Sequence, residues 1–282
     1  KRRSNYNIIE EMKSRYSQGY RVFDFEDDNL TLNKKLSIEL FNNISQVFKN
    51  KDIELYAMNG ISYFNLDIDI LNAMKNAGFQ QLNISLVSTN THICQIYERA
   101  LNTALFYTLV KEANTLGLRV IVYYIVGLPQ DNLQNIINTI CYCAKLPVEL
   151  GISIFYPVLL TDTINFISNT STKDYIRYRL TALYYECENF KRSDLYTLFI
   201  TSRIFNFLKK LNLSMHSKIL DELEKLNTTK LSLKDKIGIE VLKHFNQTKI
   251  LCAYTKDGLK PLDKFNVNLF LKILQTLDEV NP

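Results

Sequence analysis

The sequence has few of the residues that mark disulfide-stapled or metal-binding proteins. Its 282 residues include only five cysteines and three histidines. An odd number of cysteines at irregular spacing excludes a disulfide scaffold and is typical of a reducing compartment. The histidines, His92, His216 and His244, stand alone, without a second histidine or a carboxylate at ligand spacing. We therefore expect a cytoplasmic protein without a histidine-based zinc or iron site.

Long apolar runs and clusters of one charge are also missing. The longest apolar run, VIVYYIVGL at 120–128, is far shorter than the roughly 18 residues that span a bilayer. The net charge is +5, but the 34 basic and 29 acidic residues are interspersed, so no nucleic-acid face is evident. The phosphate-binding loops GxGxxG and GxxxxGK are absent. What remains, 46% hydrophobic residues with 12% aromatics, predicts a soluble globular protein without a membrane span.

A recurring pattern of helix end, glycine and β-rich run organises the first half of the chain. It occurs in QGYRVFDFED, AGFQQLNISL, LGLRVIVYYIVG and LGISIFYPV. Glycine supplies the left-handed conformation that ends a helix, and the Val, Ile, Tyr and Phe that follow suit a buried strand. With DIELYAMNG as a further strand, the pattern predicts five strands at about 21–26, 53–57, 81–86, 119–126 and 152–157.

Helical periods between these strands predict parallel βα units, and hence a barrel or an open doubly wound sheet. Asp131 with Gln134 suggests a capping box at the start of the last of these helices. After residue 160 the pattern is mainly helical, with a hairpin at 249–262 turned by Asp257-Gly258. We therefore expect two domains, 1–165 and 166–282. The predicted helices are 5–16, 34–48, 68–76, 96–115 and 132–145 in the first, and 173–191, 194–212, 216–226, 233–246 and 266–279 in the second.

Polar residues and glycines follow the predicted strands. Parallel sheets place their chemistry at the carboxyl ends of the strands, and these ends carry Asp27 and Asp28, Ser85 and Ser88, Gly127 and Pro129, and Tyr156. For the two aspartates an alternative stays open: they could cap the turn or helix that follows, since Asp and Asn favour turns.

Five segments, in order, resemble the radical S-adenosylmethionine superfamily, in particular the branch that often carries an upstream cobalamin-binding domain. They are RRSNYNIIEEMK, FDFEDDNLTLNKK, LDIDILNAMKNAGFQQLNISLVST, YERA and VIVYYIVGLPQDNLQNI. The resemblance implies an α/β fold, a partial TIM-like (β/α)6 barrel of which strands two to six are present. It also implies S-adenosylmethionine, a four-iron, four-sulfur (4Fe-4S) cluster, a reductant protein, and a 5′-deoxyadenosyl radical that abstracts hydrogen from a small-molecule or peptide substrate.

The resemblance further implies what each residue contacts. A carboxylate accepts charge-assisted hydrogen bonds from an ammonium group, and a glycine permits close approach of the backbone to a ring. In one position near Ser85 and Ser88 the chain departs from the family, whose members often have a Glu near the position of Val87. The implied contacts are Glu26, Asp27 and Asp28 for the methionyl ammonium, Ser85 and Ser88 for the ribose or methionyl group, Arg99, on a helix, for the methionyl carboxylate, and Gly127, Pro129 and Tyr156 for adenine.

The chain departs from the family in one motif, CxxxCxxC, whose thiolates ligate three irons of the cluster. Its cysteines are at 94, 141, 143, 187 and 252, and its first residue is Lys. We expect a core fragment that begins just after the motif, inactive alone, with cluster ligands and any cobalamin domain upstream. Two alternatives remain: a non-catalytic scaffold or nucleotide-binding protein without a cluster, and a helical interaction module at 173–282.

Overall fold

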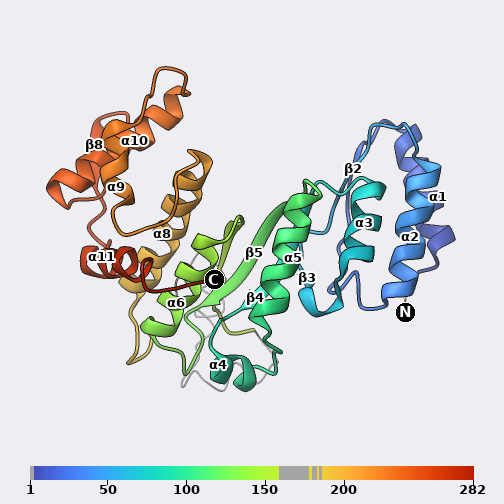
Figure 1. Cartoon of the computed structure of the whole chain (residues 1–282), viewed down its shortest axis with the longest axis horizontal. Helices are drawn as coiled ribbons and strands as arrows, with labels where there is room; N and C mark the ends of the chain where they lie inside the picture. Colours follow the sequence, from blue (N-terminus) through green and yellow to red (C-terminus); the bar gives the residue numbers. More distant parts are fainter. Residues whose placement is uncertain (1–2, 159–177, 180–182, 184–185) are drawn as a thin grey trace. The chain divides into compact units, whose positions relative to one another are not determined.

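The computed structural model describes residues 3–158, 178, 179, 183 and 186–282 (Figure 1). The chain forms two compact units, each assembled from several segments. The domain boundary predicted near residue 165 lies outside the described residues and stays a prediction. The first unit consists of Lys1–Val87, Arg99–Tyr123 and Leu146–Gly151, and the second of Ser88–Glu98, Tyr124–Lys145 and Ile152–Pro282.

The sheets of the first half of the chain are parallel, which confirms the predicted α/β class and is consistent with a partial TIM-like barrel. Four strands make a sheet in the order β3-β4-β5-β6, and β1 and β2 make a separate parallel pair. A parallel bridge between Leu55 and Phe79 lies at the edge of that pair. The strands are β1 (Val22–Asp24), β2 (Glu54–Tyr56), β3 (Ile61–Ser62), β4 (Gln81–Val87), β5 (Arg119–Val126) and β6 (Glu149–Ile154).

Two of these strands differ from the prediction. β3 was not predicted, because two residues are too few to show a period. The last strand was expected at 152–157 but runs from Glu149 to Ile154, since Gly151 lies inside the strand and does not end a helix. The preceding helix has already ended at Lys145.

The helices of the first unit have side-chain caps at their N-termini. The cap residues Ser4, Asn33, Asp67 and Asn102 each accept a hydrogen bond from a backbone N–H of the first turn, which satisfies one of the groups that a helix start leaves unpaired. Helices α2 and α3 pack side by side (Figure 1). The bounds are α1 (Asn5–Ser17), α2 (Lys34–Val47), α3 (Ile68–Ala77) and α5 (Thr103–Thr115), with a 3-10 turn at Tyr63–Asn65.

The second unit is mainly helical, as predicted for its C-terminal part. The hairpin is confirmed as an antiparallel pair, with Thr255 opposite Gly258, and Ser232 caps α10 by accepting from Asp235 N. The predicted helix 173–191 lies largely outside the described residues, and its described end is not helical, because Cys187 and Phe190 form an antiparallel bridge. The elements are α4 (Thr91–Ile96), α6 (Leu133–Lys145), α8 (Arg192–Lys210), α9 (Ile219–Glu222), a 3-10 turn (Leu223–Lys225), α10 (Leu233–Thr248), β7 (Cys252–Thr255), β8 (Gly258–Pro261) and α11 (Val267–Thr276).

Two helix starts correct the prediction. The helix expected over 96–115 is interrupted, because Glu98 adopts a left-handed conformation with φ of 51° and Asn102 caps a new helix. Helix α6 is capped by Asn132, whose Oδ1 accepts from Asn135 N at 3.0 Å, and not by a capping box of Asp131 and Gln134. Among the described residues, no helix is long and apolar enough to cross a membrane.

Candidate ligand cavity at the end of strand β1

A cavity of about 1080 Å³ lies in the first unit, beside β1 and the loop that follows it. The predicted residues Glu26, Asp27 and Asp28 all line it, together with Asp24 and Asn29. Helices α1 and α2 supply further lining residues, among them Ile8, Met12 and Leu40. The structure therefore brings the three predicted carboxylates together in one concave site.

The form of the acidic segment follows from the residue before it. Phe25 N donates to Tyr56 O at 2.9 Å, and the Phe25 ring stacks on Phe79 with centroids 5.9 Å apart. Phe25 thus anchors the chain in the core, and the next three residues emerge as exposed carboxylates. Strand β1 itself is largely exposed, so Phe25, directly after it, is the residue that fixes where the acidic segment begins.

Of the alternative that these aspartates cap the turn or helix that follows, the structure contradicts the helix cap. Asn33 caps α2, and its Oδ1 accepts from Leu36 N at 3.1 Å. Within the described part of the chain, the carboxylates of Glu26, Asp27 and Asp28 make no hydrogen bond or ion pair. They are therefore available to a ligand.

Two buried oxygen atoms in the same loop also lack partners in the part of the chain that the structure describes. Asn29 Oδ1 and Thr31 Oγ1 are buried and accept no hydrogen bond from any described residue. A buried polar atom left unpaired costs about 1–3 kcal/mol, so such atoms mark places where a ligand or water completes the structure. Asn29 lines the cavity, and its carbonyl oxygen requires a donor. A ligand that carries N–H groups fits this arrangement.

The charge of the cavity favours a cation. Five carboxylates line it, those of Glu11, Asp24 and the 26–28 segment, against two guanidinium groups, those of Arg3 and Arg15. Arg3 is already ion-paired with Glu11, Nη1 to Oε2 at 2.5 Å, and this hydrogen bond holds the pKa of Glu11 below its usual value. The remaining excess of negative charge attracts positively charged ligands.

Asp24, the last residue of β1, is a cavity residue that was not predicted. Its Oδ1 accepts from Met58 N at 3.1 Å, which ties it to the loop between β2 and β3. The alternation of FDFED could have indicated it, since Asp24 occupies the polar position between two phenylalanines.

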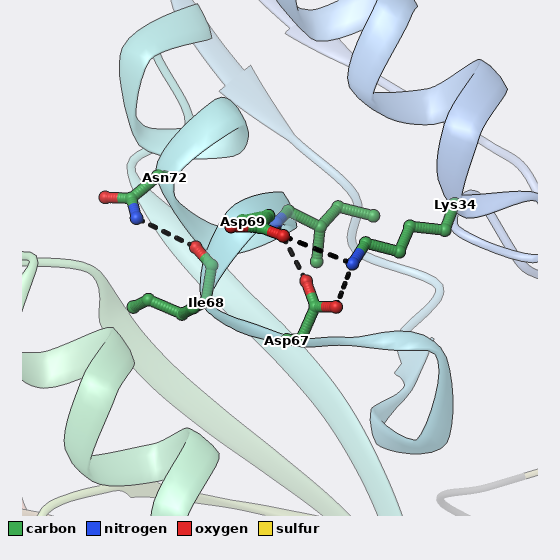
Figure 2. A network of polar contacts seen from close by, with 6 residues as sticks. Lys34, Asp67, Ile68, Asp69 and Asn72 are labelled. Atoms are coloured by element: carbon green, nitrogen blue, oxygen red, sulfur yellow. Dashed lines mark hydrogen bonds and ion pairs between the residues drawn. The ribbon is translucent and has the colours of Figure 1, made fainter.

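A second polar cluster joins helices α2 and α3, and its charged groups pair with one another. Figure 2 shows Lys34, in the first turn of α2, reaching Asp67 and Asp69 at the start of α3. Burial alone would raise the pKa of Asp67, but its contacts with Lys34 and with Ile70 N–H outweigh burial and leave the pKa below the usual value. This cluster joins α2 to α3 and so fixes the far end of the acidic loop.

The structure does not bring Ser85 or Arg99 to the cavity. Ser85 is partly exposed on β4, and neither residue is among those that line the cavity. Arg99 is exposed in the connection between α4 and α5 and not on a helix as predicted, because the left-handed Glu98 has ended the helical turn. Val87, where family members often have a Glu, is buried with φ of 68°, a strained conformation for a β-branched residue.

The remaining predicted residues belong to the second unit. Ser88 is buried, and its hydroxyl accepts from Asn90 N at 3.1 Å. Gly127 has φ of +81° and packs on Leu195 and Phe190. Pro129 O accepts from Tyr97 Oη at 2.7 Å. Tyr156 is half-exposed just beyond the end of β6.

A buried carboxyl, Asp131, organises the turn that follows Gly127. It accepts from Asn132 N and Asn135 Nδ2, and burial raises its pKa. Its backbone carbonyl accepts from Asn189 Nδ2 at 3.0 Å. Asp131 therefore stabilises this turn through several elements of the second unit.

Comparison with known proteins shows which sequences this chain is similar to. No family model matches the chain. It is 27% identical over 143 residues to an uncharacterized methyltransferase of Pyrococcus horikoshii, which is 50% of this chain and 30% of that protein. It is 26% identical over 131 residues to a cytidylyl-2-hydroxyethylphosphonate methyltransferase of Streptomyces wedmorensis, 46% of this chain and 24% of that protein.

The structural comparison decides the fold. The radical S-adenosylmethionine methyltransferase TsrM of Kitasatospora setae, solved with cobalamin and a [4Fe-4S] cluster, superposes with a TM-score of 0.50 at 14% identity, over 54% of this chain and 31% of that one. The chain has a radical S-adenosylmethionine fold. The resemblance predicted from the sequence is thus confirmed at the level of the fold. The chain spans less than a third of each of these three relatives.

Within the radical S-adenosylmethionine fold, the described residues do not supply a cluster site. They contain no group of three or more His, Cys, Asp or Glu side chains placed to hold a metal ion. Four of the five cysteines are buried, and Cys187 is half-buried. The carboxylates that line the cavity fit an organic cation. The described residues do not provide the grouped thiolates that an iron–sulfur cluster requires.

Proposed function

We propose that this chain is the core of a radical S-adenosylmethionine enzyme and that its acidic cavity binds the methionyl ammonium of S-adenosylmethionine. The observation that carries the proposal is the set of three cavity carboxylates, Glu26, Asp27 and Asp28, which pair with no described residue, beside Asn29 Oδ1, which also has no described partner. Carboxylates form short, strong hydrogen bonds with ammonium groups.

The relatives support methyl transfer as one reaction class, alongside hydrogen abstraction from a small-molecule or peptide substrate. Under this proposal, the 4Fe-4S cluster is ligated by cysteines upstream of this chain and is reduced by a separate protein, and cobalamin belongs to an upstream domain. Ser85, Ser88, Arg99, Gly127, Pro129 and Tyr156 remain proposed contacts of the rest of the cofactor. Five free thiols favour a reducing, cytoplasmic compartment.

Binding of S-adenosylmethionine to the full-length protein tests the ammonium site. We expect the double variant Asp27→Asn, Asp28→Asn to bind more weakly by about 10-fold or more, because one hydrogen bond to a charged group contributes about 1.5–3 kcal/mol. The deaminated analogue, in which a keto group replaces the ammonium, should bind wild type and variant alike. Isothermal titration calorimetry measures both.

The matched control is Glu10→Gln, which removes an exposed carboxylate of α1 that pairs with Lys13 and does not line the cavity. It should bind as wild type does. Unchanged affinity of the Asp27, Asp28 double variant for S-adenosylmethionine would contradict the proposal. Full-length protein that binds S-adenosylmethionine but takes up no iron on anaerobic reconstitution would instead correspond to the scaffold without a cluster.

A further inference from the structure

A chain of hydrogen bonds runs through the first unit from β4 to the acidic cavity. It begins at Gln81 and Asn83, which are only 7% and 1% exposed. Gln81 Nε2 donates to Asn83 Oδ1 at 2.7 Å, and Asn83 Nδ2 donates to Tyr123 Oη at 2.7 Å. Because buried amides are costly unless paired, these bonds fix the position of the Tyr123 hydroxyl.

Tyr123 passes this constraint to the cavity. Its hydroxyl donates to Met58 O at 3.0 Å, and the N–H of the same residue, Met58, donates to Asp24 Oδ1 at 3.1 Å. Met58 is itself 53% exposed, so its side chain is only partly packed and its backbone hydrogen bonds help to hold the loop. The two hydrogen bonds on either side of Met58 therefore connect Tyr123 to a cavity carboxylate.

Two glycines form a slot for the Tyr123 ring. A Cβ at Gly151 would lie 2.4 Å from Tyr123 Cδ1, and a Cβ at Gly60 would lie 3.1 Å from Cδ2. Real Cβ atoms do not approach to 2.4 Å, so only glycine at 151 admits the ring in this position. The two glycines lie beside the two edges of the ring, Cδ1 and Cδ2, and together hold it in one place.

We propose that Tyr123 is a positioning residue for the ligand cavity: through Met58 it holds Asp24 where Asp24 joins the 26–28 carboxylates in binding an ammonium group. This inference rests on the proposed function, from which it takes the ligand. It adds Asp24 to the ammonium site and assigns Tyr123 a role that acts through another residue. The Tyr123 hydroxyl does not itself contact the ligand.

The test uses Tyr123→Phe in the full-length protein, a change that removes one oxygen atom and keeps the ring in its slot. We expect affinity for S-adenosylmethionine to fall by about 2–10-fold, the equivalent of one net hydrogen bond, with no change for the deaminated analogue. The double variant Asp24→Asn, Tyr123→Phe should bind no more weakly than Asp24→Asn alone, since coupled residues are not additive. Hydrogen exchange of the Met58 amide should be faster in Tyr123→Phe.

The control is Tyr56→Phe, which removes a hydroxyl that donates to Glu54 Oε2 at 2.8 Å and should leave both affinities unchanged. An equal loss for both ligands in Tyr123→Phe, or full additivity with Asp24→Asn, would overturn the inference and leave the proposed function standing. Equal binding of both ligands by wild type would remove the ammonium site and with it the proposed function and this inference.

Discussion

At the scale of single residues, burial decides which side chains are available for chemistry. Cys141 and Cys143 of α6 are completely buried, and burial raises the pKa of both thiols to about 12. Cys187, in contrast, is half-buried. Because the thiolate is the reactive form, the cysteines of this chain differ sharply in expected reactivity.

Alkylation measures this difference directly. With iodoacetamide at about pH 8, where a thiol of this pKa is ionised in about one molecule in ten thousand, Cys141 and Cys143 should stay unmodified in the folded protein while Cys187 is labelled first. Peptide mapping by mass spectrometry identifies the labelled sites. The same reaction in concentrated guanidinium should label all five cysteines. Labelling of Cys141 at the rate of Cys187 in folded protein would show that α6 opens readily.

At the scale of elements, single residues at the ends of helices and strands stabilise the two units. Asp67 caps α3 and also pairs with Lys34 of α2 (Figure 2), so one side chain contributes to two elements. Gly127 ends β5 in a left-handed conformation. Each feature makes a separate prediction, one electrostatic and one conformational.

Asp67→Asn removes the charge and keeps a side chain that caps well. Since the pKa of Asp67 is lowered in the folded state, its ionised form stabilises the protein above the unfolded pKa near 4, and this stabilisation is lost as the pH falls through the folded pKa. We expect the variant to unfold at a lower temperature than wild type at about pH 7 and at the same temperature at about pH 2.

The difference should stay below about 1 kcal/mol, because the Asp67 side chain is 43% exposed and solvent screens such pairs. Circular dichroism melts at the two pH values measure it. Asp69→Asn is the control: Asp69 is 73% exposed and 3.4 Å from Lys34, so its effect should be smaller. A difference that persists unchanged at the low pH would show that charge is not the cause.

Gly127→Ala should destabilise the second unit. A left-handed conformation costs a residue with a Cβ about 1–2 kcal/mol, and the new methyl would lie 3.0 Å from Leu195 Cδ2. Gly258→Ala is the matched control, because Gly258 has φ of +99° but nothing within 4 Å of a Cβ. Urea denaturation should show a larger loss for Gly127→Ala. Equal losses would mean that Leu195 moves aside at no cost.

At the scale of the whole molecule, the sequence predicted the order of parallel βα units because glycine followed by a β-rich run recurs. It did not predict the break at Glu98, which depends on one backbone dihedral, or the start of β6, where Gly151 accommodates a ring from a neighbouring strand. The acidic segment was predicted as a site. Asn29 and Asp24 were not, since their roles depend on unpaired atoms and on Met58, which lies 34 residues away from Asp24.

The slot around Tyr123 also limits how this protein can vary. Positions 60, 123 and 151 come from three separate segments. The ring of Tyr123 nevertheless requires the absence of a side chain at position 151 and leaves little space for one at position 60. A substitution at 151 therefore becomes acceptable only after the aromatic ring at 123 has been replaced by something smaller. In an evolving lineage these positions should change as a set and in that order, with the small side chain at 123 coming first.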